Sequence, residues 1–188
     1  MSSEKKTVYI TFVGAIDKPL VNKFIAFRTN AVNAHKPDEL YFMLASNGGD
    51  VDSGFVLYNY LQALQGGMKV TMHNIGNIDS IANVIFLSGE KRFASPNASF
   101  HFHGVGMNVS GAMSRNALKE TLSRCEGMEN RIIKTISSRS KLSTDTLEGL
   151  FSQGEGKAVD FALEHGIIEA IKVPSVPSGA VHLVMNFA

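Results

Sequence analysis

The stretch ELYFMLASNGGDVDSGFVLYNYLQAL, residues 39–64, decides the fold class of this 188-residue chain. It opens with a short apolar run, Glu39 to Ala45, which stops at the turn residues Asn47-Gly48-Gly49. From Ser53 to Leu64 the apolar residues recur at helical spacing and make one wide face. The stretch therefore predicts a strand, a glycine turn and a helix.

The same alternation continues on both sides of this unit. The expected strands are 8–13, 69–75, 92–94, 99–103 and 167–171, and the expected helices are 18–34, 80–87, 144–151 and 157–165. Strands that alternate with helices are typical of a mainly parallel sheet covered by helices. We therefore predict an α/β fold.

The segment from Ala112 to Ser138 is expected to form one long projecting helix. Its intermittent apolar stripe consists of Leu118, Leu122, Cys125, Met128, Ile132, Ile133 and Ile136. Such a stripe covers the sheet or is buried against a second copy of the chain. Because no low-complexity linker divides the sequence, we expect one domain over residues 1–188, with a core of about 8–171 and an irregular C-terminal tail, 172–188.

Composition excludes several classes of protein. Hydrophobic residues make up 44% and charged residues 19%, as in an ordinary globular chain, and the formal net charge is +1, which offers no attraction for nucleic acid. The single cysteine, Cys125, suits a reducing compartment. No secretory signal and no apolar run of about 20 residues is visible, so we expect a cytoplasmic protein without a membrane partner.

Three places combine a tight turn or strand with reactive chemistry. The turn Ser46 to Asp50 is either an oxyanion or phosphate cradle or a simple strand-to-helix turn. Ser80 is either a nucleophile at the start of a helix or only its cap. His101 and His103 share one face of a strand, where one of them is a general base, both bind zinc, or both are merely polar residues on a solvated face.

Four motifs in this order resemble one family. They are Tyr41 to Gly54, Gly76 to Ala82, Lys91 to Phe93 followed by Pro96-Asn97, and Ala162 to Ile168. Together they are similar to the proteolytic subunit of the Clp protease, within the wider group that includes the crotonases. The resemblance covers roughly residues 8–171.

The resemblance implies a serine endopeptidase that hydrolyses peptides or unfolded proteins. It places the nucleophile at Ser80, the general base at His103 and not at His101, and the oxyanion N–H groups at Gly49 and Ile81. It implies no metal or organic cofactor. It also implies a homo-oligomeric ring assembly with the active sites in an inner chamber.

The chain departs from the family pattern at three points. Gly154 stands where the family has its catalytic aspartate. The neighbouring Glu155 is one candidate for this role, and the alternatives are a dyad without an acid and a different acid. Asp79 precedes the nucleophile in place of a small apolar residue, and we expect it to point away and cap the helix. The first strand starts near Val8, so coupling to an ATPase unfoldase is not expected.

Two other functions remain open. A catalytically silent Clp-like scaffold subunit would account for Asp79 and for the missing acid. A crotonase-type acyl-CoA enzyme would keep the fold, but that chemistry relies on oxyanion N–H groups and carboxylates and needs no serine nucleophile.

Overall fold

The computed structural model describes residues 5–185, so the outermost residues of the expected N-terminal segment and tail lie outside it. The strands are β1 (Thr7–Val13), β2 (Glu39–Ser46), β3 (Lys69–Asp79), β4 (Lys91–Ala94), β5 (Ser99–Phe102), β6 (Glu155–Ala158), β7 (Ala170–Ile171) and β8 (Val181–Met185). The helices are α1 (Lys18–His35), α2 (Val51–Leu64), α3 (Ala82–Phe86), α4 (Arg115–Ser138), α5 (Thr144–Gln153) and α6 (Val159–Glu164). The predicted α/β fold is confirmed.

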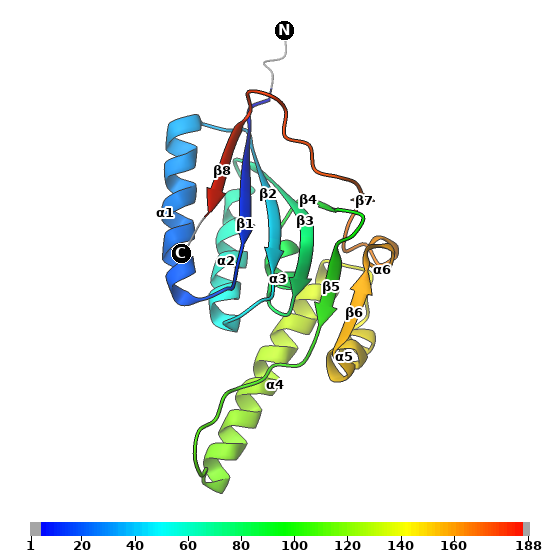
Figure 1. Cartoon of the computed structure of the whole chain (residues 1–188). Coiled ribbons are helices and arrows are strands. Elements are labelled where there is room, and N and C mark those ends of the chain that lie inside the picture. Colours follow the sequence, from blue (N-terminus) through cyan, green and yellow to red (C-terminus); the bar gives the residue numbers. More distant parts are fainter. Residues whose placement is uncertain (1–4, 186–188) are drawn as a thin grey trace.

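The sheet has the strand order β6-β5-β3-β2-β1-β8, with β4 beside the first half of β3 and β7 beside β4. All of these pairs are parallel except β5 with β6. The long strand β3 changes partner along its length, because Thr71 to Asn74 pair with β4 whereas Asn77 to Asp79 pair with β5. Figure 1 shows α1 and α2 along one side of this sheet and α4 projecting below it.

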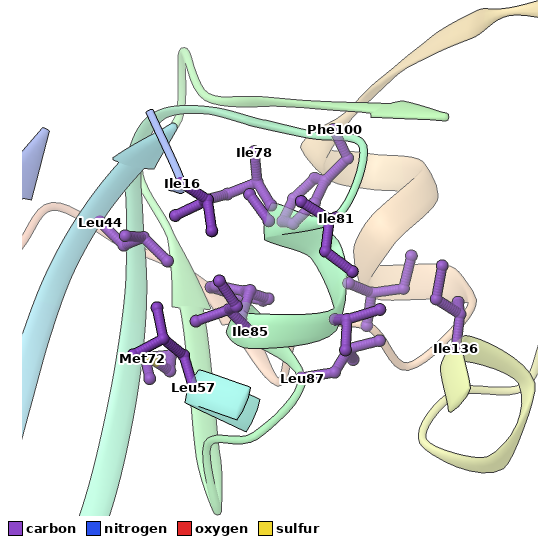
Figure 2. Packing of buried hydrophobic residues seen from close by; sticks show 14 of the residues in the cluster. Ile16, Leu44, Leu57, Met72, Ile78, Ile81, Ile85, Leu87, Phe100 and Ile136 are labelled. Carbon is purple, nitrogen blue, oxygen red and sulfur yellow. The ribbon is translucent and has the colours of Figure 1, made fainter. Parts of the chain in front are cut away.

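The core lies between the sheet and its helices, and all six helices, α1 to α6, contribute buried residues to it. Helices α1 and α2 each begin with a side-chain cap. Asp17 accepts the Leu20 N–H of α1 at 2.7 Å, and Asp50 accepts the Ser53 N–H of α2 at 2.9 Å. In Figure 2, Leu57 of α2 approaches Met72 of the sheet, beside Ile85 of α3. Each large apolar side chain buried in this way contributes roughly 1.5–3 kcal/mol.

The projecting helix α4 is confirmed and begins three residues later than expected, with Ser114 as its cap. Its apolar stripe divides into two parts. Ile132, Ile133 and Ile136 are buried in the core, whereas Leu118 and Leu122 are 54% and 59% exposed. The second half of the stripe therefore packs on its own domain, and the alternative of burial against a second copy is wrong for these three residues.

Two strands were not predicted. The tail expected to be irregular contains β8, which pairs with β1 over Val8 to Phe12 and so covers an edge that β1 would otherwise leave open. The helix expected over 157–165 begins only at Val159, since the preceding residues form β6 against β5. The last expected strand is reduced to Ala170–Ile171. None of the helices in residues 5–185 is long and apolar enough to cross a membrane.

Candidate active site

The carboxyl ends of β2, β3 and β5 meet at one edge of the sheet. Ser46, at the end of β2, pairs with Ile78, and Asp79, at the end of β3, pairs with His101 of β5. The glycine turn after β2, the serine after β3 and the two histidines of the β5 segment are thereby brought to the same place. In open α/β sheets this edge is the usual position of a functional site.

Ser80 has a strained backbone. Its φ of 55° lies in the left-handed region, which costs a residue with a side chain roughly 1–2 kcal/mol. Four hydrogen bonds hold this segment. The Ser80 N–H donates to the His101 carbonyl at 3.0 Å, and the Asn83 backbone N–H donates to the Ser80 carbonyl at 3.1 Å. The side-chain amide of Asn83 donates to the Ser80 and His101 carbonyls at 3.1 and 3.0 Å. Strain that the surroundings enforce is a recurrent feature of functional sites.

Neither Ser80 nor Asp79 caps the following helix. The cap position of α3 is Ile81, and no side chain makes a capping hydrogen bond there. The expectation that Asp79 caps the helix is therefore wrong. Its carboxylate instead accepts a hydrogen bond from Asn77 at 2.8 Å, and Asn77 also donates to Asn47 of the glycine turn at 2.5 Å. This chain of polar contacts joins the turn to the end of β3.

Two glycines let the turn pack closely against its neighbours, Gly48 against Ser80 and Gly49 against Ile16. A Cβ on Gly48 would lie 2.8 Å from both the Ser80 Cβ and the Asp79 carbonyl oxygen, and one on Gly49 would lie 2.1 Å from the carbonyl oxygen of Ile16. Both have positive φ, 82° and 148°. No other residue type fits at either position without moving the backbone.

Two backbone donors next to Ser80 are unused. Neither the Gly49 N–H nor the Ile81 N–H makes a hydrogen bond to another residue within 5–185, although the neighbouring Gly48 and Asp50 N–H groups are both bonded. Ile81 is itself fixed, because its buried side chain packs where a Cβ on Gly54 of α2 would otherwise sit. The two residues thus offer free donors on rigid backbone.

The two histidines lie on one face of the β5 segment, as predicted. Phe100 and Phe102 point into the core with no exposed surface, and the rings of His101 and His103 have centroids 5.3 Å apart. Each ring nitrogen that contacts a backbone carbonyl must carry the proton, because a carbonyl oxygen only accepts. His103 Nδ1 donates to the Gly104 carbonyl at 2.9 Å, and His101 Nε2 donates to the Gly154 carbonyl at 3.1 Å.

His103 is therefore the histidine with an available lone pair on Nε2, the nitrogen that takes the proton in serine hydrolases. Among the described residues, no hydrogen bond joins the Ser80 hydroxyl to His101 or His103. Such bonds are often long without substrate and tighten when it binds.

The structure does not bring Glu155 to His103. In the antiparallel β5–β6 pair, Glu155 is opposite Phe102 and so lies on the face away from the histidines, where its carboxylate forms an ion pair with Lys157. Gly154 ends α5 with a left-handed backbone and has no side chain to offer. Within residues 5–185, no three His, Cys, Asp or Glu side chains gather in a way that could hold a metal ion.

Two residues that hold this site together were not predicted from the sequence. Asn83 is a buried polar residue in an otherwise apolar helix, which was a signal that it has a specific partner. Glu129, on α4, accepts a hydrogen bond from the Val105 N–H at 3.0 Å, just beyond His103. No pattern in the sequence marks Glu129, since its partner lies 24 residues away.

The model of the Clp protease family matches residues 2–174, so the chain belongs to that family. By sequence it is similar to the ATP-dependent Clp protease proteolytic subunit 2 of Pseudomonas aeruginosa, with 23% identity over 177 residues that cover 92% of this chain and 85% of the relative.

Two further relatives agree with this membership. The ATP-dependent Clp protease proteolytic subunit of Dehalococcoides mccartyi (strain CBDB1) is 24% identical over 168 residues, which cover 86% of this chain and 80% of the relative. A solved structure of a ClpP1 mutant from Listeria monocytogenes superposes with a TM-score of 0.73 at 20% identity, covering 89% of this chain and 91% of that one. At this identity the structure supports the fold alone.

Proposed function

We propose that this protein is a serine endopeptidase that uses Ser80 as its nucleophile and His103 as its general base. The observation that carries the proposal is the convergence of Ser80, held in a strained turn, with two free backbone N–H groups beside it. Membership of the Clp protease family supports a peptidase. The relatives are named as proteolytic subunits.

The chemistry follows from the roles of these groups. His103 Nε2 takes the Ser80 hydroxyl proton as the Ser80 oxygen attacks a peptide carbonyl, and the carbonyl oxygen becomes an oxyanion. The N–H groups of Gly49 and Ile81 donate to that oxyanion, an interaction whose loss costs about 100- to 1,000-fold in other serine hydrolases. His103 then returns the proton to the leaving amine, and water releases the acyl group by the same steps.

We also propose that the protein works as a homo-oligomer that encloses these sites. The exposed part of the stripe on α4, Leu118 and Leu122, is an apolar surface, and the preceding loop adds Met107 and Val109, which are also exposed. A helix that projects from its domain with such a surface is suited to contact a second copy. The single Cys125 suits assembly in a reducing compartment such as the cytoplasm.

One observation favours a silent scaffold subunit instead. The position of the family's acid is a glycine, and no side-chain carboxylate contacts His103 directly within the described residues. Such a subunit would share the fold and the assembly but would not react with a serine-directed reagent.

Labelling with a fluorophosphonate and mass determination of the product separates the two functions. We expect modification at Ser80, and Ser80→Ala and His103→Ala are expected to lose labelling and peptide hydrolysis to a similar extent, since nucleophile and base act as one unit. His101→Ala is the matched control and should keep most of the activity. An unlabelled wild-type protein would support the scaffold, and an inactive His101→Ala with an active His103→Ala would transfer the role of base to His101.

A further inference from the structure

The backbone beyond His103 is held on several sides. The His103 Nδ1–H donates to the Gly104 carbonyl, the Gly104 N–H donates to the Phe151 carbonyl of α5 at 3.0 Å, and the Val105 N–H donates to the Glu129 carboxylate of α4 at 3.0 Å. Two of these bonds share one chemical group. The Gly104 carbonyl and the Val105 N–H belong to the same peptide unit.

We propose that Glu129 is the positioning carboxylate of His103 and acts on it through the Gly104–Val105 peptide group. The inference rests on the proposed function, in which His103 is the base. It assigns to a helix residue the part that an aspartate beside the histidine has in a Ser-His-Asp triad.

The arrangement forms a continuous chain of hydrogen bonds. The Glu129 carboxylate accepts the N–H of the peptide, and the carbonyl of that peptide accepts the imidazole N–H. Hydrogen bonds to a charged acceptor are shorter and about twice as strong as neutral ones, and bonds in such a chain polarise one another. A carboxylate on the N–H therefore makes the Gly104 carbonyl a better acceptor, which favours the tautomer with a free Nε2 and supports the imidazolium that forms during catalysis.

Close packing gives the contact its geometry. A Cβ on Gly104 would lie 3.1 Å from Glu129 Oε2, so the carboxylate is packed over the Cα of Gly104. A side chain at position 104 would push Glu129 away from the peptide.

The other carboxylates near the two histidines have their own partners. Asp79, on the same face of the sheet as His101, is bonded to Asn77, and Glu155 is paired with Lys157 on the opposite face. The ring of His101 is the titratable group in contact with that of His103, Asp79 is paired with His101 across the strands, and Glu129 acts through the peptide. His101 is a second imidazole on the same face, so it is removed in the pH experiment.

The test compares Glu129→Gln, Glu129→Ala and Glu126→Gln in the full chain with His101→Gln as the common background. Glu126 is the matched control because it lies on the same helix, is exposed and takes no part in a hydrogen bond with a described residue. For each variant, kcat and KM for a peptide and the rate of fluorophosphonate labelling are measured across pH, and thermal unfolding verifies the fold.

Glu129→Gln keeps an acceptor for the Val105 N–H but removes the charge. We expect its kcat to fall roughly 3- to 10-fold with little change in KM, and the acid limb of kcat/KM to move to lower pH, because the imidazolium loses support. Glu129→Ala should lose on the order of 100-fold, and Glu126→Gln should behave as the background does.

Two results would overturn the inference while leaving the proposed function intact. One is a Glu129→Gln variant whose kcat and acid limb match those of Glu126→Gln. The other is a loss of activity in both Glu129 variants without any movement of the acid limb, which would indicate a purely structural contact. Failure of the proposed function gives a different result: Ser80 of the wild-type protein is not labelled at all. In that case the inference about Glu129 is refuted together with the proposed function.

Discussion

Gly48→Ala is the substitution that tests most directly whether the glycine turn is built against the nucleophile. The added Cβ would lie 2.8 Å from the Ser80 Cβ and from the Asp79 carbonyl oxygen. Carbon atoms pack at about 3.5–4.0 Å, so the turn and Ser80 must separate by roughly 0.7 Å or more. In addition, Gly48 has a φ of 82°, where an alanine costs roughly 1–2 kcal/mol.

We expect two measurable effects from this change. The free energy of unfolding should fall by about 1–3 kcal/mol, the backbone cost plus part of the contact cost. The rates of peptide hydrolysis and of fluorophosphonate labelling should fall on the order of 10- to 100-fold, because misplacing reacting groups by about 1 Å costs up to about 100-fold.

Gly127→Ala is the matched control for this experiment. A Cβ there meets nothing within 4 Å, and the position is in the interior of α4. The control should therefore raise the free energy of unfolding by about 0.5–1 kcal/mol and leave labelling unchanged. A folded Gly48→Ala protein that labels Ser80 at the wild-type rate would refute the idea that this turn sets the position of the nucleophile.

Two further predictions concern stability and assembly. Burial lowers the pKa of His73 to about 4, and its ring accepts the Tyr41 hydroxyl at 2.6 Å and donates to the Lys172 carbonyl at 3.0 Å. Because an unfolded histidine titrates near 6.5, the unfolded state binds the extra proton between these two values, so stability should fall as the pH is lowered through this window. In His73→Gln, the free energy of unfolding, measured in urea above and below this pH window, should change less with pH than in the wild-type protein. An unchanged pH dependence would refute the prediction. Leu122→Asp, on the exposed part of α4, should lower the assembly mass in light scattering without changing thermal unfolding, whereas Ile132→Asp should unfold the domain by burying an unpaired charge at a cost of several kcal/mol. A Leu122→Asp protein of unchanged mass would show that this surface is not the assembly contact.

The sequence predicts those parts of the fold that depend on local patterns. The strand, glycine turn and helix of residues 39–64 are correct to within one or two residues, because their apolar periodicity and turn residues act over short distances. Strand β6 has no such pattern, since its four residues, Glu155 to Ala158, are mostly polar or small and become a strand by pairing with β5. Strand β8 likewise depends on the edge of β1, a partner about 170 residues away.

The candidate site divides in the same way. Short motifs mark the glycine turn, Ser80 and the two histidines as candidates, because each motif is a few residues long, and the family resemblance then selects Gly49 and His103 among them. The hydrogen bond that selects the tautomer of His103 depends on the direction of the Gly104 carbonyl, which no residue pattern encodes. The partner of the same peptide, Glu129, comes from a helix that reaches the site only after the chain has folded.

The missing aspartate at Gly154 is therefore not sufficient evidence for a silent subunit. The acid of a Ser-His-Asp triad has two roles: it orients the imidazole with Nε2 free, and its charge stabilises the imidazolium. Here the Gly104 carbonyl meets the first requirement with a neutral group, and Glu129 is placed to meet part of the second from across one peptide. A carboxylate separated from the imidazolium by a peptide group stabilises it less than one in direct contact, since the electrostatic interaction weakens with distance. We therefore expect an active but slow peptidase, faster than a variant without Glu129 and slower than a relative with a carboxylate on the histidine itself.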